Sequence, residues 1–494
     1  MAKVHYLLSL LLALTIAPLL FAQEPTQPVR LELPFNTQET RTEVIALPDS
    51  SLLLYYKNSN VWNTKADFNF TRYNHRLEEV WKSSATVEPD KEYVRHFTEA
   101  PFTYIIFSGE KSEEFTFLKL NLKNGSSETT THTLEDVDAI YEFNVLYGKY
   151  FLIGRNRENL RPLLLYLNPA EKEAKILPAV YGAESTFSDM LADPSSGRVD
   201  VVMTESNGRV SRLQVKSFNS LGKLISNNFI LQQDDKSLLN AEITPGDTTQ
   251  KILLGTYGSR DLRYTRGFFS SPLASSYSNG RFYNLLQLQN FLKYMKSRRE
   301  ERTRNRESAR VNSGKETTFR YRVLLHDLIA TPEGYVLAGE IYYPQYRSNN
   351  SFWSTPRSSF QNRTHEGFKR THAVALGFDK QGILIWDNTF PLKDVSTPEL
   401  YHALEVGYSP DGRVIMAYPD KEKIIYHVMH EDEFEDEEND LEILLYNKND
   451  KVQFTEYPGL INWYGANFVA FGFQRIKPSG AEAKTIFYIN KISF

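Results

Sequence analysis

Tyr150-Phe151-Leu152-Ile153-Gly154 is a short apolar run closed by glycine, and runs of this kind recur along the chain. Continuous apolar runs of four or five residues are typical of strands that are covered on both faces. Eight such runs begin at Leu52, Tyr104, Tyr150, Val199, Ile252, Tyr335, Val414 and Phe468. Most intervals between them are about 50 residues, the length of one four-stranded propeller blade. The repeat predicts an all-β chain whose buried strands stack as blades around a ring.

Turn signals flank the runs at similar offsets. Pro48-Asp49 and Pro410-Asp411-Gly412 precede two of the buried strands, and these residue types favour turn dihedrals. Later in the repeat, Phe378-Asp379-Lys380-Gln381-Gly382 has the form of a hairpin turn. Eight runs favour eight blades, although one irregular unit would leave seven. The exception to strand periodicity is residues 285–310, where apolar residues fall on one helical face, namely Leu285, Leu288, Leu292 and Met295.

The last unit, residues 460–494, has room for three strands only. Residues 29–35 form an unassigned strand at the other end of the chain. Pairing this strand with the last sheet would complete a blade and remove an exposed edge. We therefore predict a ring closed by an N-terminal strand.

The segment Phe378-Asp379-Lys380-Gln381-Gly382-Ile383-Leu384-Ile385-Trp386 resembles the repeat element of bacterial secreted propellers, including the quinoprotein-like ones. It is also similar to repeats in exported envelope proteins without an assigned activity. The resemblance implies the propeller fold and a location outside the cytoplasm. Quinoprotein enzymes hold their cofactor over a vicinal cysteine pair, and this chain has no cysteine. We therefore expect no cofactor.

The N-terminus has the pattern of a secretory signal peptide. Lys3 and His5 precede an apolar run over residues 6–21, and Ala22 is the small residue at the expected cleavage position. No later stretch is apolar for long enough to cross a bilayer, and the net charge of −4 does not suggest nucleic-acid binding. We expect residues 1–22 to be removed. Residues 23–494 then form one exported domain in the periplasm, on the cell surface or outside the cell.

Several ionisable residues are expected on inner strands, where they would line the central channel. His326 and Asp327 fall on the first strand of the sixth unit, His402 and Glu405 on the first strand of the seventh, and His372 on a third strand. Imidazoles and carboxylates on neighbouring strands can bind a metal or act as acid and base. The alternative is a set of hydrogen-bonded channel residues without chemistry. The spacing distinguishes neither, so the catalytic assignment stays open and no metal site is predicted.

Three insertions lie at residues 285–318, 343–370 and 430–442. Basic residues predominate in the first two, and aromatic residues accompany them in the second. Arginines beside aromatic rings can hold an anionic polymer or a carbohydrate. We select Arg298, Arg302, Trp353 and Arg357 as candidate ligand contacts. Residues 431–442 hold nine acidic side chains, so pairing within the chain is the alternative. That run lacks the spaced pattern of a calcium loop.

Two functions remain open. The first is a non-enzymatic binding or scaffold protein of the cell envelope, which recognises a protein or glycan partner through one elaborated face over units five to seven. The second is a hydrolase or lyase that acts on a polysaccharide or peptide at the channel mouth. The serine-hydrolase elbow, the zinc-protease helix motif and the phosphate-loop motif are all missing from the sequence.

Overall fold

The computed structural model describes residues 24–494, with gaps at 38–39, 59–65, 111–112, 179–184, 231–234, 248, 275–279, 349–362 and 435–438. The predicted signal peptide, Trp353 and Arg357 lie outside the described residues. Within the described part, no helix is both long and apolar enough to span a membrane.

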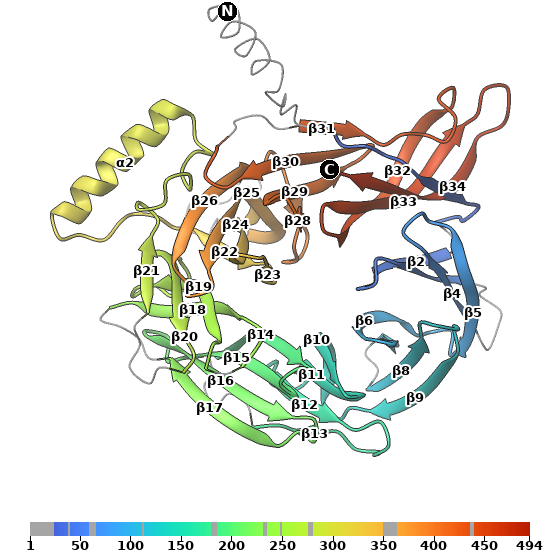
Figure 1. Ribbon diagram of the computed structural model, residues 1–494, viewed down its shortest axis with the longest axis horizontal. Coiled ribbons are helices and arrows are strands. Elements are labelled where there is room, and N and C mark those ends of the chain that lie inside the picture. Colours follow the sequence, from blue (N-terminus) through green and yellow to red (C-terminus); the bar gives the residue numbers. More distant parts are fainter. Residues whose placement is uncertain are drawn as a thin grey trace, which may run out of the picture.

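The chain folds into an eight-bladed β-propeller, as the eight apolar runs predict. Each blade is an antiparallel sheet whose strands follow chain order from the centre to the rim (Figure 1). Blade one consists of β2 (Thr40–Ala46), β3 (Leu52–Asn58), β4 (Ala66–Tyr73) and β5 (Glu79–Val87), and blade two of β6 (Glu92–Glu99), β7 (Phe102–Ser108), β8 (Glu114–Asn121) and β9 (Ser127–Thr133). Blade three consists of β10 (Val137–Leu146), β11 (Lys149–Asn156), β12 (Pro162–Leu167) and β13 (Lys175–Ile176). Blade four consists of β14 (Thr186–Asp193), β15 (Arg198–Ser206), β16 (Ser211–Asn219) and β17 (Leu224–Ile230).

The next three blades contain the long insertions. Blade five consists of β18 (Ser237–Ile243), β19 (Ile252–Gly258), β20 (Gly267–Pro272) and β21 (Arg281–Asn284). Blade six consists of β22 (Arg322–Leu325), β24 (Gly334–Ser348), β25 (Arg363–Asp379) and β26 (Leu384–Pro391), with the short strands β23 (Ile329–Ala330) and β27 (Ser396–Thr397). Blade seven consists of β28 (Glu405–Tyr408), β29 (Arg413–Asp420), β30 (Lys423–His430) and β31 (Asn439–Glu442). The eighth blade is β32 (Lys451–Tyr464), β33 (Asn467–Lys477), β34 (Lys484–Ser493) and β1 (Arg30–Leu33).

Apolar clusters fill the space between neighbouring blades. Eight clusters alternate with the eight blades, and the second strand of each blade contributes to the clusters on both of its sides. For example, Ile105 and Phe107 of β7 face the first blade, whereas Tyr104 and Ile106 face the third. Burial on both faces explains why these strands are continuous apolar runs rather than alternating ones.

The N-terminal strand closes the ring, as predicted. β1 pairs antiparallel with β34, from Arg30 opposite Asn490 to Leu33 opposite Phe487. The Arg30 guanidinium donates hydrogen bonds to Glu32 (2.8 Å), Gln474 (2.8 Å) and Asn490 (3.0 Å). These contacts bind the first described strand to two strands of the C-terminal unit.

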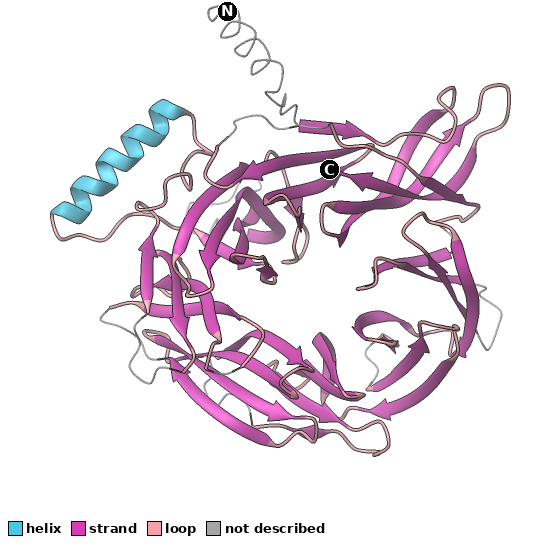
Figure 2. Cartoon of the chain, viewed as in Figure 1, coloured by secondary structure: helices cyan, strands magenta, loops and turns pink. Residues whose placement is uncertain are grey.

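The insertion between β21 and β22 differs in part from the predicted helix. Helix α2 (Ser297–Asn312) projects from the rim (Figure 2), but residues 285–295 form turns whose apolar side chains join the core between blades five and six. The Asn284 side chain accepts hydrogen bonds from the Leu286 and Gln287 amides. The Asp387 carboxylate accepts those of Gln289 and Asn290, both at 2.8 Å. These side chains satisfy amides in turns that compete with a helix.

The sequence pattern predicts that the acidic run follows the second strand of unit seven. The structure places the run after the third strand of blade seven, β30, so this prediction was wrong. Turns between third and fourth strands open at the opposite end of a blade from the β24–β25 turn. The expected gathering of all three insertions on one face therefore does not occur. In the described part of the run, the Asp432 carbonyl accepts a hydrogen bond of 2.8 Å from the Asn290 side-chain amide of the first insertion. Lys293 Nζ lies 5.0 Å from the centre of the Phe434 ring.

Candidate functional site in the central channel

Seven consecutive blades each carry an ionisable residue at a similar position on, or directly after, the innermost strand. These residues are Glu43, Arg95, Glu142, Asp189, Glu242, Asp327 and Glu405. Each lies eight to ten residues before the first residue of the apolar run in its own blade. This spacing is visible in the sequence. Of the seven residues, only Asp327 and Glu405 are among the candidates that the sequence analysis names.

β-Bulges position three of these side chains. The pairing of the first and second strands shifts register between Tyr93 and Arg95 in blade two, and the same shift immediately precedes Glu142 in blade three and Asp189 in blade four. A bulge adds one residue to a strand and turns the following side chain to a new direction. The repeated bulge therefore aims charged side chains from successive blades into the channel.

A cavity of about 960 Å³ lies in the channel between blades two and six. Its wall includes four carboxyl groups, those of Glu142, Asp189, Glu242 and Asp327. Aromatic and aliphatic side chains line the rest of the wall, among them Phe97, Tyr141, Phe143, Phe187, Leu328 and Tyr335. A large, mainly apolar pocket with a few converging polar groups is the usual form of a small-molecule site.

Three of these carboxyl groups, those of Glu142, Asp189 and Glu242, hold protons more strongly than ordinary carboxyls. Burial raises the pKa of Glu142 to about 7, the negative charge of Asp327 adds to this effect, and Arg95 opposes it. Burial also raises the pKa of Glu242 well above its usual range, with further contributions from Asp189, Asp327 and Glu142. The Glu142 side chain is open to water in the channel, yet protein surrounds it closely enough to weaken its hydration. Convergence of such groups in a cavity is typical of a functional site.

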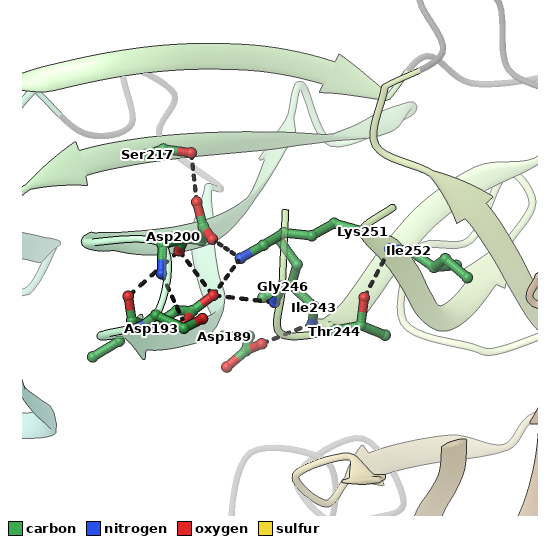
Figure 3. Close-up of polar contacts among 12 residues, drawn as sticks. Asp189, Asp193, Asp200, Ser217, Ile243, Thr244, Gly246, Lys251 and Ile252 are labelled. Atoms are coloured by element: carbon green, nitrogen blue, oxygen red, sulfur yellow. Dashed lines mark hydrogen bonds and ion pairs between the residues drawn. The ribbon is translucent and has the colours of Figure 1, made fainter. Parts of the chain in front are cut away.

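Asp189 is held at the interface of blades four and five (Figure 3). Its Oδ2 accepts a hydrogen bond of 2.8 Å from the Ile243 amide, next to Glu242. Burial still raises the pKa of Asp189 to about 7 despite this bond. Behind it, the fully buried Lys251 pairs with the fully buried Asp200, which also accepts from the Ser217 hydroxyl. This ion pair fixes the two blades that carry Asp189 and Glu242.

The Glu242 carboxylate lacks a hydrogen-bond donor among the described residues, although Glu242 is only 7% exposed. A buried carboxylate without a partner is costly in free energy, by several kcal/mol in ordinary cases. Such a group is satisfied by protonation or by a ligand that brings a positive charge. Because Glu242 lies on the cavity wall, a ligand in the cavity can reach its carboxylate.

The structure brings two of the three selected histidines together. The rings of His326 and His402 stack with 3.9 Å between their centres. His326 Nε2 lies 3.1 Å from Glu340, which also accepts from the Arg370 guanidinium and from the Ala403 amide. His402 Nε2 donates a hydrogen bond of 2.7 Å to the Leu325 carbonyl. These contacts join blades six and seven beside the cavity.

His372 lies apart from that pair. It is fully buried, it stacks on Tyr294 at 3.9 Å between ring centres, and burial lowers its pKa to about 3. Glu405 accepts a hydrogen bond from the Asn462 amide at 3.0 Å, and burial raises its pKa. In the part of the chain that the structure describes, no group of three His, Cys, Asp or Glu side chains is arranged to hold a metal ion.

The two arginine candidates on α2 differ in their surroundings. Arg302 lines a groove between the helix and residues 318–321, whereas Arg298 is exposed and does not line it. Neither of them forms an ion pair with the described part of the acidic run.

No family model and no curated protein matches this chain. Several solved propeller structures are similar to it at low identity. The polysaccharide lyase Uly1 is 9% identical with a TM-score of 0.37, covering 81% of this chain and 89% of that one. The propeller domain of the Trilobed protease from Pyrococcus furiosus is 7% identical with a TM-score of 0.34, covering 81% and 93%.

A Synechocystis apocarotenoid oxygenase variant is 8% identical with a TM-score of 0.32. The match covers 47% of this chain and 61% of the oxygenase, less than two thirds of its length. At these identities and TM-scores, none of the three supports a conclusion about activity. The functional argument depends on the channel itself.

Proposed function

We propose that this chain is an exported binding protein of the cell envelope that takes up a small organic cation in the channel cavity. The observation that carries the proposal is the Glu242 carboxylate, which lines the cavity and has no hydrogen-bond donor among the described residues, although the residue is only 7% exposed. An ammonium or guanidinium group would supply the missing donor and the missing positive charge. The aromatic part of the wall would cover the apolar body of such a ligand, and its cation would also be attracted by the ring faces.

The raised pKa values support a cation over a neutral or anionic ligand. Near pH 7, Glu142 and Asp189 are balanced between their charged and neutral forms, because protein surrounds them and neighbouring carboxylates repel their negative charges. A bound cation relieves both effects, so it binds the ionised form and displaces protons. His96, which also lines the cavity, is neutral in this range because burial lowers its pKa to about 4.

The test is calorimetric titration of the purified protein with benzylamine and with agmatine, using benzyl alcohol as the neutral control. We expect amine affinity to rise at least tenfold between pH 5.5 and pH 8, with release of protons. Glu242→Gln should weaken binding by about tenfold or more. Glu173→Gln, a substitution of an exposed carboxyl far out on blade three, should leave binding unchanged.

Benzyl alcohol that binds as tightly as benzylamine would contradict the proposal, as would an affinity that falls with increasing pH. If neither amine binds the parent protein at millimolar concentration, the proposed ligand class is wrong.

A hydrolase or lyase is the second candidate, and one observation favours it. Glu142 and Asp189 both have pKa values of about 7 and line the same cavity. Carboxyls tuned to near neutrality can act as general acid and general base. Incubation with a panel of polysaccharides and peptides, followed by mass analysis of products, tests this function. Cleavage that is lost in Glu142→Gln would favour the enzyme over the binding protein.

A further inference from the structure

A groove of about 460 Å³ lies between α2 and the chain segment that returns to blade six. Four arginines line it: Arg299, Arg302 and Arg306 from the helix and Arg320 from the returning segment. The three helical residues are spaced by three and four positions, so they share one face of α2. The groove is separate from the acidic cavity and shares no lining residue with it.

Two other arginines of the helix, Arg304 and Arg310, hold the insertion together. Arg304 pairs with Glu300 at 2.8 Å and donates to the carbonyls of Leu288 and Gln289 in the preceding turns. Arg310 donates to the Glu316 carbonyl at 3.1 Å. These contacts fasten both ends of α2 to the insertion.

The arginines that line the groove do not fasten the helix to the insertion in this way. Arg299 and Arg302 have neither an ion pair nor a hydrogen bond with the described residues, and both are exposed. Arg306 pairs with Glu307 at 2.9 Å, which offsets one of the four positive charges. Glu307 is fully buried and accepts the Thr318 amide at 2.7 Å. Glu307 thus holds the returning segment, with Arg320, against the arginine face of the helix.

The positive charge continues beyond the groove. Arg320, Arg322 and Arg263 all place their guanidinium groups over the ring of Tyr264, at 6.0, 5.6 and 5.4 Å from its centre. Arg263 pairs with Asp261, whereas Arg320 and Arg322 have no carboxylate partner among the described residues. Arg322 and Arg263 line a second hollow, of about 310 Å³, on the other side of Tyr264. We name the connected set of Arg299, Arg302, Arg306, Arg320 and Arg322 the arginine strip.

We infer that the arginine strip binds a linear anionic polysaccharide that carries carboxylate or sulfate groups. A row of separate guanidinium groups matches charges repeated along a chain better than one isolated anion, and guanidinium forks pair with such groups through two hydrogen bonds. The Thr303 side chain lines the same groove, whereas the Thr318 hydroxyl donates to the Glu307 carboxylate.

A nucleic acid fits the strip less well, because sequence-tolerant binding of single strands needs open aromatic faces for the bases. The ring of Tyr264 is already covered by guanidinium groups. Phe319 is only 6% exposed, and Tyr321 packs against Phe291 and Tyr294. The aromatic residues here support the arginines and do not form a stacking platform.

The experiment measures binding of the full mature chain to immobilised dextran sulfate and polygalacturonate, with neutral dextran as the blank. We expect Arg302→Ala with Arg320→Ala to weaken binding to at least one polyanion by tenfold or more at 50 mM salt, with an unchanged melting temperature. Arg298→Ala is the matched control, because Arg298 is an exposed arginine on the same helix outside the groove. It should change the affinity less than twofold. Glu242→Gln should leave polyanion binding intact.

Three results would overturn the inference. The first is failure of the parent protein to bind either polyanion at 50 mM salt. The second is an equal loss in Arg298→Ala, which would indicate only diffuse charge. The third is tighter binding of single-stranded DNA than of both polysaccharides under the same conditions.

Discussion

Replacing Glu43 by glutamine should stabilise the folded protein at alkaline pH and leave it unchanged at acidic pH. Glu43 lies on β2, at the channel position that Glu142 and Glu242 occupy in their blades. Burial raises its pKa from 4.5 to about 7, and the positive charge of Arg95 only partly opposes this. No described residue forms a hydrogen bond with the carboxyl, so glutamine removes the charge without breaking a contact.

The sign and the size of the effect follow from this shift in pKa. Below pH 4.5 the carboxyl is protonated in both the folded and the unfolded chain, so the parent and the variant are equal. Between pH 4.5 and 7 the unfolded chain ionises first, and the parent loses stability. At about 1.4 kcal/mol per pKa unit, the shift from 4.5 to about 7 makes the loss at pH 8 slightly more than about 3 kcal/mol. Water in the channel screens part of it, so we expect about 2 kcal/mol.

The assay is thermal unfolding at pH 4.5 and pH 8 under identical salt. For a domain of this length, about 2 kcal/mol corresponds to an increase in melting temperature of about 2 °C. Glu173→Gln serves as the exposed control and should show no increase at either pH. A variant that melts lower than the parent at pH 8, or one whose gain is the same at both pH values, would refute the reasoning.

Three further outcomes are expected. Lys251→Met should destabilise the protein by about 3–5 kcal/mol in thermal unfolding, because it leaves Asp200 buried without its counter-charge; if Asp200→Asn in the same chain does not recover part of the loss, the ion pair is not its cause. Deletion of residues 23–36 should lower the melting temperature far more than trimming an unpaired terminus does, since it removes β1 and exposes β34; an unchanged melting temperature contradicts this. Intact-mass measurement of the exported protein should give a chain that begins at or near Gln23, and a mass that includes residues 1–22 would disprove cleavage.

The architecture was accessible from the sequence because one signal is repeated eight times. A strand covered on both faces must be apolar at every position, and glycine and proline turns mark its ends. The closing strand followed from a count of strands in the last unit. Both expectations depend on local patterns that packing between blades reinforces, and the β1–β34 pairing confirms the second.

Two local errors have identifiable causes. The turn between β29 and β30 consists of Lys421, with a φ of 56°, and Glu422, and the Pro419-Asp420 turn signal directly before it was overlooked. The two strands consequently appeared as one, and the acidic run was placed one strand too early. Residues 285–295 have helical periodicity, but the side chains of Asn284 and Asp387 take the amides that a helix would use.

The acidic cavity was mostly missed for a different reason. Its carboxyls come from different blades, and each is a single charged residue in an otherwise ordinary strand. Asp327 was selected through its neighbour His326, whereas Glu142, Asp189 and Glu242 were not. Their shared offset from the apolar runs was visible, but the direction of each side chain depends on a bulge that residue types do not reveal.

The closing blade also determines the order of events during synthesis and export. Arg30 is among the first residues of the domain to emerge, but its partner Asn490 is among the last. Until β34 is available, a nascent chain has an unsealed ring with a bare sheet edge on each side of the gap. A protease or chaperone that meets the nascent chain therefore encounters an open ring, and the ring can close only after β34 has been synthesised.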